Sequence, residues 1–161
     1  MLSEVTERRS VRQLLVIELN EQQESEIRKH GEQEYPHECC GLLIGRIADE
    51  GRTRIVEETY PVANAWGGEG ERHHRMLIKP EDYMRAERSF RDRGIGVIGN
   101  YHSHPDHPAV PSEFDLKNLA PWPTMSYIVV SVREGKTVDV RSWELEADGT
   151  RFNEEEISKG D

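Results

Sequence analysis

Short apolar runs separated by polar turns dominate the hydrophobic pattern of this chain. Runs of about four to eight residues rich in Val, Ile, Leu and Tyr are typical of strands. The segments that fit cover residues 14–19, 41–45, 53–62, 95–104, 127–132 and 137–145. Shorter strands are expected at residues 76–78 and near Phe152, and Glu134-Gly135 is expected to turn the last long pair into a hairpin. The pattern predicts a sheet as the main structure.

Helix signals occur in three places. Asn20 followed by Gln23 resembles a capping box, which predicts a helix over residues 21–34. A second helix is expected over residues 80–94, framed by a proline at its first position and a glycine at its end. A short third helix is expected over residues 112–119. Together these elements indicate an α+β fold with one mixed sheet and two main helices packed on it.

The length of 161 residues suits one domain that buries a core of its own. No repeat, linker or low-complexity segment divides the chain, so residues 1–161 are expected to form a single domain. Residues 1–12 and 154–161 are charged and aperiodic, and we expect frayed termini there. The glycine-rich stretch 64–74 is expected to be a loop.

Composition narrows the class of protein. The chain has 21 Lys and Arg against 31 Asp and Glu, a formal net charge of −10 with no basic block, which argues against binding nucleic acid or anionic lipid. No stretch approaches the roughly 20 apolar residues of a membrane span, and the N-terminus lacks the apolar core of a signal peptide. The two cysteines, Cys39 and Cys40, are adjacent and favour a reduced compartment. We therefore expect a cytoplasmic protein.

Two histidines and an aspartate form the most informative candidate site. His102 and His104 lie two residues apart in a predicted strand, so both imidazoles face the same side. Asp115 follows a proline-rich loop that could bring its carboxylate back to them. Two histidines and one aspartate suit zinc, and three protein ligands leave a fourth tetrahedral position for water, as in catalytic sites. The spacing predicts a catalytic zinc centre.

Other interpretations of these residues stay open at this point. A lone His-x-His pair is weak evidence for a metal, and Ser112 with Asp115 also fits a helix N-cap and its partner. The capping and metal-binding interpretations can coexist. Glu38 follows His37, but Gly41 occupies the position of the second histidine in a His-Glu-x-x-His zinc helix, so that motif is absent.

The candidate residues together form a pattern that is far more specific than any one of them. The pattern consists of Glu38 just before a Cys-Gly-Leu-Leu strand, then His102, His104, Ser112 and Asp115. This pattern resembles the JAMM (MPN-plus) zinc metalloprotease family over nearly the whole domain. The resemblance implies a cytidine-deaminase-like α+β fold, in which two main helices pack on a mixed, partly rolled sheet and a short helix follows the zinc loop.

The resemblance also implies a role for each signature residue. His102, His104 and Asp115 would hold one catalytic zinc ion. Glu38 would be the general acid/base, and Ser112 would help to polarise the scissile carbonyl. A noncatalytic MPN binding module is the alternative, and it predicts neither stoichiometric zinc nor hydrolysis that depends on Glu38.

The compact chain is similar to prokaryotic members of that family. Only residues 116–123 separate Asp115 from the next predicted strand, which leaves little room for the insertions of the deubiquitinating branch. The resemblance implies hydrolysis of the amide bond after the C-terminal Gly-Gly tail of a ubiquitin-like sulfur-carrier protein, the expected partner. An isopeptidase that removes a ubiquitin-like modifier from lysines is the alternative.

Two further features bear on the substrate. The loop over residues 64–74 is either a candidate flap over the tail or a plain surface loop. An acidic carrier would have to dock on a local basic surface, and the candidates on the second helix are Arg85, Arg88, Arg91 and Arg93.

Overall fold

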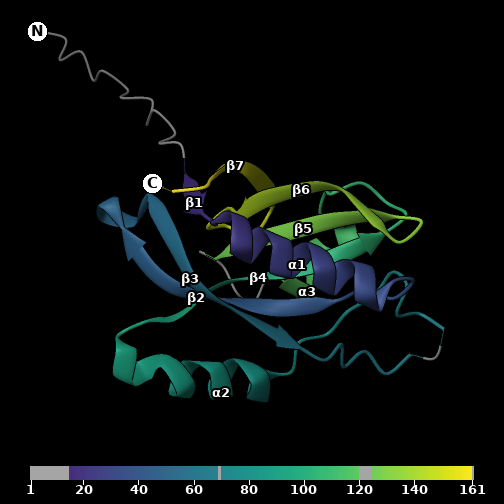
Figure 1. Cartoon of the computed structure of the whole chain (residues 1–161), viewed down its shortest axis with the longest axis horizontal. Coiled ribbons are helices and arrows are strands. Elements are labelled where there is room, and N and C mark those ends of the chain that lie inside the picture. The colour runs from purple at the N-terminus through teal and green to yellow at the C-terminus, as the bar shows by residue number, and fades with distance from the viewer. Residues whose placement is uncertain (1–14, 69, 120–124, 161) are drawn as a thin grey trace, which may run out of the picture.

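Seven strands close into a barrel in the computed structural model, which describes residues 15–68, 70–119 and 125–160 (Figure 1). The strands are β1 (Val16–Glu18), β2 (Cys40–Ala48), β3 (Thr53–Val62), β4 (Gly96–Pro105), β5 (Ser126–Arg133), β6 (Lys136–Leu145) and β7 (Phe152–Ser158). Their order around the barrel is β1-β3-β2-β4-β5-β6-β7. β1 runs parallel to both neighbours and β4 parallel to β5, whereas the other pairs are antiparallel. The mixed sheet is confirmed, but it is closed rather than partly rolled; the likeness to the cytidine-deaminase fold stays a prediction.

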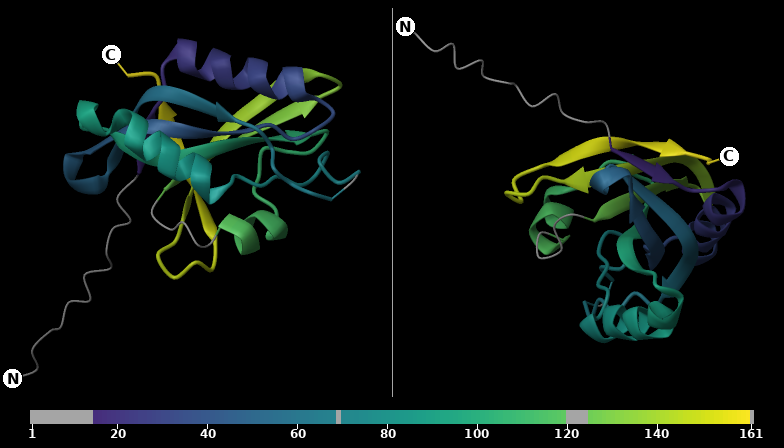
Figure 2. Two further views of the ribbon diagram at one scale, coloured as in Figure 1. Left: turned by 90° about the horizontal axis from the view of Figure 1, so that it is seen from below. Right: turned by 90° about the vertical axis from the view of Figure 1, so that its left-hand side faces the viewer.

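The three expected helices are present. They are α1 (Glu21–Glu34), α2 (Pro80–Phe90) and α3 (Glu113–Leu119), with short 3-10 turns η1 (Asp49–Gly51) and η2 (Arg91–Arg93). The predicted capping box starts α1, because Gln23 N–H donates to Asn20 Oδ1 at 2.8 Å and Asn20 N–H donates to Gln23 Oε1 at 3.0 Å. Figure 2 shows α1 and α2 on different sides of the strands. Within the described ranges, no helix has the length and apolar character needed to cross a membrane.

Two apolar cores lie on the two faces of β2. Cys39 and Leu43 pack in the core that receives Ile27 of α1, whereas Cys40 packs in the core that receives Tyr83 of α2. Side chains alternate along a strand, so successive residues of this apolar run enter opposite cores. Both thiols are buried, and burial raises the pKa of Cys39 to about 12, which suits a packing role.

The C-terminal segment corrects one expectation. The prediction of a frayed end over residues 154–161 is wrong, because β7 pairs with β6 and, in parallel, with β1. Its acidic residues alternate between the two faces: Glu155 is buried, whereas Glu154 and Glu156 are exposed. The high charge of the segment therefore hides a strand that completes the barrel. The expectation for residues 1–12 lies outside the described residues.

The short strand expected over residues 76–78 is also wrong. Leu77 is exposed between two buried apolar neighbours, and this alternation imitates a strand. However, Leu77 N–H donates to the Asn64 side chain at 3.1 Å, and its carbonyl accepts the Ala65 N–H at 2.9 Å. These contacts fold the segment into the loop between β3 and α2 instead of a ladder.

Candidate metal centre

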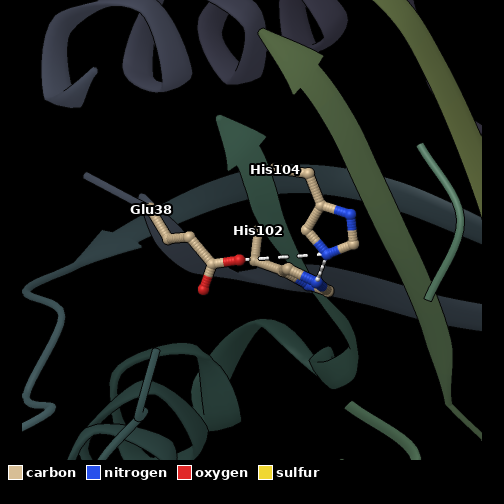
Figure 3. Close-up of side chains that lie close together, drawn as sticks. All are labelled: Glu38, His102 and His104. Carbon is tan, nitrogen blue, oxygen red and sulfur yellow. Dashed lines mark hydrogen bonds and ion pairs between the residues drawn. The ribbon is translucent and has the colours of Figure 1, made fainter. Parts of the chain in front are cut away.

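His102 and His104 point to the same side of β4, as the strand alternation predicts (Figure 3). Their Nε2 atoms lie 3.0 Å apart. Asp115, in the first turn of α3, places Oδ2 3.3 Å from His102 Nε2 and 3.1 Å from His104 Nε2. All three residues are buried. The structure thus brings the three sequence-predicted ligands together, with one donor atom of each converging on the others.

This donor set fits a zinc ion. Tetrahedral zinc with bonds of about 2.0–2.1 Å keeps its ligand atoms about 3.3 Å apart, close to the separations of these three atoms. His104 Nδ1 lies 2.9 Å from the Pro108 carbonyl oxygen, so Nδ1 carries the proton and donates it. The Nε2 lone pair is then free to bind a metal, as is typical of zinc-binding histidines. The residues present therefore suit zinc in their geometry, and His104 also in its tautomer.

Ser112 and Asp115 also cap α3. Asp115 N–H donates to Ser112 Oγ at 3.0 Å, and Ser112 N–H donates to Asp115 Oδ2 at 2.8 Å. The same Oδ2 faces the two imidazoles, so the capping and ligand interpretations hold together. Burial opposes ionisation of Asp115, but the charges and hydrogen bonds of His102 and His104 hold the pKa of its carboxyl well below the usual range. The carboxylate is therefore ionised, as a metal ligand must be.

Glu38 lies beside this cluster, just before β2. Its side chain is buried, and Oε1 lies 3.8 Å from His104 Nε2 (Figure 3). Burial raises the pKa of Glu38 to about 7, while the charges of His102 and His104 oppose that shift. A carboxyl group with a pKa near neutrality can accept a proton and return it. A bound cation would lower this pKa and favour the proton-accepting form.

Three residues outside the signature hold Glu38 in place. Glu38 N–H donates to the Arg72 carbonyl at 2.7 Å, and Asn64 Nδ2 donates to the Glu38 carbonyl at 3.2 Å. Ser103, between the two histidines, accepts the N–H of Cys39 on its Oγ at 2.8 Å. Strand alternation indicates only that Ser103 faces away from the metal ligands. Sequence reasoning missed all three contacts, because each joins segments that meet only after folding.

A cleft of about 370 Å³ opens next to the centre. Its lining comprises Glu38, His104 and Ser112 of the site, Pro105, His107, Pro108 and Val110 of the loop after β4, and His73, His74 and Arg75 of the loop before α2. The end of the loop expected as a flap therefore borders the same cleft as the proline-rich loop after β4.

The family of this chain follows from its sequence. Residues 20–146 match the model of the Prok-JAB family, described as prokaryotic homologs of the JAB domain. The match covers most of the chain, which therefore belongs to this family of JAMM/MPN proteins, as the resemblance predicted.

Three curated relatives are similar to the chain. Tail tip assembly protein K of Escherichia phage N15 is 37% identical over 105 residues, which make up 63% of this chain and 37% of that protein. Desampylase of Haloferax volcanii is 31% identical over 96 residues, 60% of this chain and 63% of that protein. A probable TtuB-protein conjugate cleaving protease of Thermus thermophilus is 33% identical over 97 residues, 60% of this chain and 58% of that protein. The chain thus spans less than two thirds of each relative.

Two solved structures share the fold. The solution structure of a protein from Desulfitobacterium hafniense is 36% identical, with a TM-score of 0.73 over 88% of this chain and 90% of that chain. The crystal structure of a JAB1/MPN domain protein from Archaeoglobus fulgidus is 18% identical, with a TM-score of 0.51 over 90% of this chain and 99% of that chain. The second likeness supports the JAB/MPN fold alone.

Proposed function

We propose that this protein is a zinc metallopeptidase that hydrolyses the amide bond after the C-terminal Gly-Gly tail of a ubiquitin-like protein. One observation carries the proposal: the buried carboxyl of Glu38 stands 3.8 Å from His104 Nε2, next to the converging atoms of His102, His104 and Asp115 and at the wall of an open cleft. A proton-transferring group beside a metal centre is the arrangement that metal-assisted hydrolysis requires.

Each signature residue has a distinct task in this mechanism. His102, His104 and Asp115 would hold the zinc ion, which supplies Lewis-acid chemistry by acidifying water and stabilising negative charge. Glu38 accepts a proton from the attacking water and delivers it to the departing nitrogen. Ser112 Oγ already accepts the Asp115 N–H, so its own proton is free to donate to the scissile carbonyl oxygen from the cleft wall.

The names of the relatives support a substrate that contains a ubiquitin-like protein. One relative is a desampylase and another is named for cleaving TtuB–protein conjugates. Two leaving groups are then chemically possible: a C-terminal extension of a sulfur-carrier protein, or a lysine of a target protein. A glycine pair suits a tail that enters this cleft, because it has no side chains to clash with the two bordering loops.

The second helix offers a docking surface for an acidic partner. The four arginines of α2 and η2 are exposed, but Arg85 pairs with Asp82 at 3.2 Å and Arg93 pairs with Glu58 at 3.1 Å. Neither Arg88 nor Arg91 takes part in an ion pair within the described ranges. We propose that these two charges meet the carrier, since unpaired surface cations steer acidic partners.

The proposed roles of Glu38 and the ligands are separable by mutation. Glu38→Gln keeps the size and burial of the side chain but cannot accept the proton, so we expect it to bind zinc normally and lose at least about 100-fold in turnover. His102→Ala removes a ligand and should lose both zinc and activity. Metal analysis of the purified variants and intact-mass analysis of a Gly-Gly-tailed carrier with a C-terminal extension measure the two properties. Cleavage by Glu38→Gln at the wild-type rate would contradict the assignment.

A further inference from the structure

Basic side chains gather along the cleft beside Glu38. Arg75, His73, His74 and His107 all line it, and Glu38 contributes the only carboxylate among the described lining residues. The lining thus has more basic than acidic side chains, whereas the whole chain has a net charge of −10. Burial lowers the pKa of His74, so the fixed positive charge of the described lining belongs to Arg75. A fixed cation in the cleft of an acidic protein points to an anionic group on the substrate.

Arg75 is held in place by an aromatic ring rather than by an acid. Its Cζ lies 4.0 Å from the ring centroid of Phe114, and the Trp66 ring meets the same ring edge-on at 5.4 Å. One guanidinium nitrogen donates to the His74 carbonyl at 3.0 Å. No ion pair between described residues includes Arg75. A guanidinium stacked on an aromatic ring keeps its other N–H groups available for a carboxylate.

The Arg75 backbone is fixed next to the general acid/base. Asn64 Nδ2 donates both to the Glu38 carbonyl at 3.2 Å and to the Arg75 carbonyl at 2.9 Å. Arg75 and Glu38 line the same cleft. Because Glu38 is proposed to deliver a proton to the departing nitrogen, a charged group close to that nitrogen lies within the cleft that Arg75 also borders.

The two possible leaving groups differ in charge at this position. An α-amino acid carries its carboxylate carbon two bonds from the departing nitrogen, so the anion leaves beside Glu38. A lysine that departs through its side-chain nitrogen has no anion there, since only methylene groups follow. A cation next to the general acid/base therefore favours the first leaving group.

We propose that Arg75, assisted by the neighbouring histidines of the cleft, binds the free α-carboxylate of a single amino acid attached to the Gly-Gly tail. This inference rests on the proposed function and selects between its two leaving groups. In the reaction, the water oxygen bonds to the terminal glycine carbonyl carbon and the C–N bond breaks. The departing nitrogen receives a proton through Glu38, so the products are the Gly-Gly carboxylate and a free amino acid.

Three matched probes test the inference. A ubiquitin-like protein with a Gly-Gly tail from the same genome is prepared with alanine, with alaninamide, or with Nα-acetyl-lysinamide linked through its side-chain nitrogen. The first two differ only in the terminal charge. For the zinc-loaded wild type we expect kcat/KM to be about 10- to 100-fold higher for alanine than for alaninamide, as the loss of one charge-assisted pair predicts. The lysine-linked probe should be cleaved no faster than alaninamide.

The Arg75→Gln variant should abolish that preference, so that alanine and alaninamide are cleaved with similar kcat/KM. The preference is the ratio of two kcat/KM values measured on the same protein sample. Partial misfolding or zinc loss lowers both values equally, so it does not change the ratio. Arg151→Gln removes an exposed arginine remote from the cleft lining and should keep the preference. Equal rates for alanine and alaninamide, or an equal loss on both in Arg75→Gln, would overturn the inference but leave the proposed function intact. Failure of the wild type to cleave any probe would overturn both.

Discussion

Asp115 shows how one side chain can serve both the helix that carries it and the site that it faces. Its Oδ2 accepts the Ser112 N–H and also lies within 3.3 Å of both imidazoles. The helix cap fixes the rotamer of the carboxylate before any metal binds, which lowers the entropy lost on binding. The capping residue of the helix and the candidate metal ligand are thus the same aspartate.

At the scale of single residues, His30 provides a test of how stability depends on pH. Tyr101 Oη lies 2.8 Å from His30 Nδ1, and the neutral ring can accept the hydroxyl proton. Burial lowers the pKa of His30, with the Glu34 carboxylate acting in the opposite direction. Because the folded pKa lies below the unfolded value of about 6.5, the neutral ring contributes stability above that pH. That contribution is lost as the pH falls through the folded pKa.

His30→Phe should therefore destabilise the protein by about 1 kcal/mol at pH 7.5 and by less at pH 5.5. Urea unfolding of the wild type and the variant at both values measures the difference. His37→Phe, at an exposed position, is the control for removal of an imidazole. If the loss of stability in His30→Phe were larger at pH 5.5 than at pH 7.5, the proposed direction of the pH effect would be wrong.

At the scale of elements, the pairing of β2 with β4 positions the two candidate histidine ligands. Gly41 lies opposite Tyr101 in this ladder, and Cys40 lies opposite His102. The Tyr101 ring lies across Gly41, so a Cβ at that position would overlap the ring. The glycine therefore makes room for a buried tyrosine next to a ligand, and close approach explains its place in an apolar strand.

Gly41→Ala should force the Tyr101 ring away and destabilise the protein by about 1–3 kcal/mol, the usual cost of overpacking a core. Thermal or urea denaturation measures the change. Gly67→Ala is the matched control, because an added Cβ there meets no atom within 4 Å. Equal stability of the two variants would mean that the ring moves without cost.

At the scale of the whole molecule, a buried polar group accompanies closure of the barrel. Arg54 of β3 lies 3.5 Å from Glu155 of β7 and 3.5 Å from Glu144 of β6. Ser142 Oγ donates to the other oxygen of Glu155 at 2.7 Å. These contacts connect strands on both sides of β1, which has only three residues of its own. Charged side chains thus reinforce the seam where the shortest strand closes the barrel.

Removing one member of this group should cost far more than removing a neighbouring surface acid. Glu155→Ala leaves the buried Arg54 with one carboxylate fewer and should destabilise the protein by about 3 kcal/mol. Glu154→Ala, one residue earlier, removes an exposed pair with Arg141 at 3.9 Å and should cost less than about 1 kcal/mol. Denaturation curves of the two variants compare these values directly, and similar losses would refute a structural role for the buried group.

The local parts of the site could be predicted from the sequence because they depend on regular periods. Strand alternation puts His102 and His104 on one face, and the spacing of Ser112 and Asp115 is that of a helix cap. The continuation of β7 through the charged residues after Phe152 and the cleft-lining role of Arg75 could not be predicted. Both depend on contacts with segments far away in the sequence. The local spacing of hydrophobic and polar residues carries no information about such contacts.

The sequence by itself determined the helices, most of the strands and which side chains are candidate metal ligands, because propensity, capping and side-chain alternation act over a few residues. Only the tertiary structure decided that the sheet closes, that Glu38 stands 3.8 Å from His104, and that Arg75 faces the same cleft. Closure and convergence require loop segments to give up conformational entropy in exchange for burial elsewhere in the barrel. That balance belongs to the whole fold and cannot be assigned to any one segment.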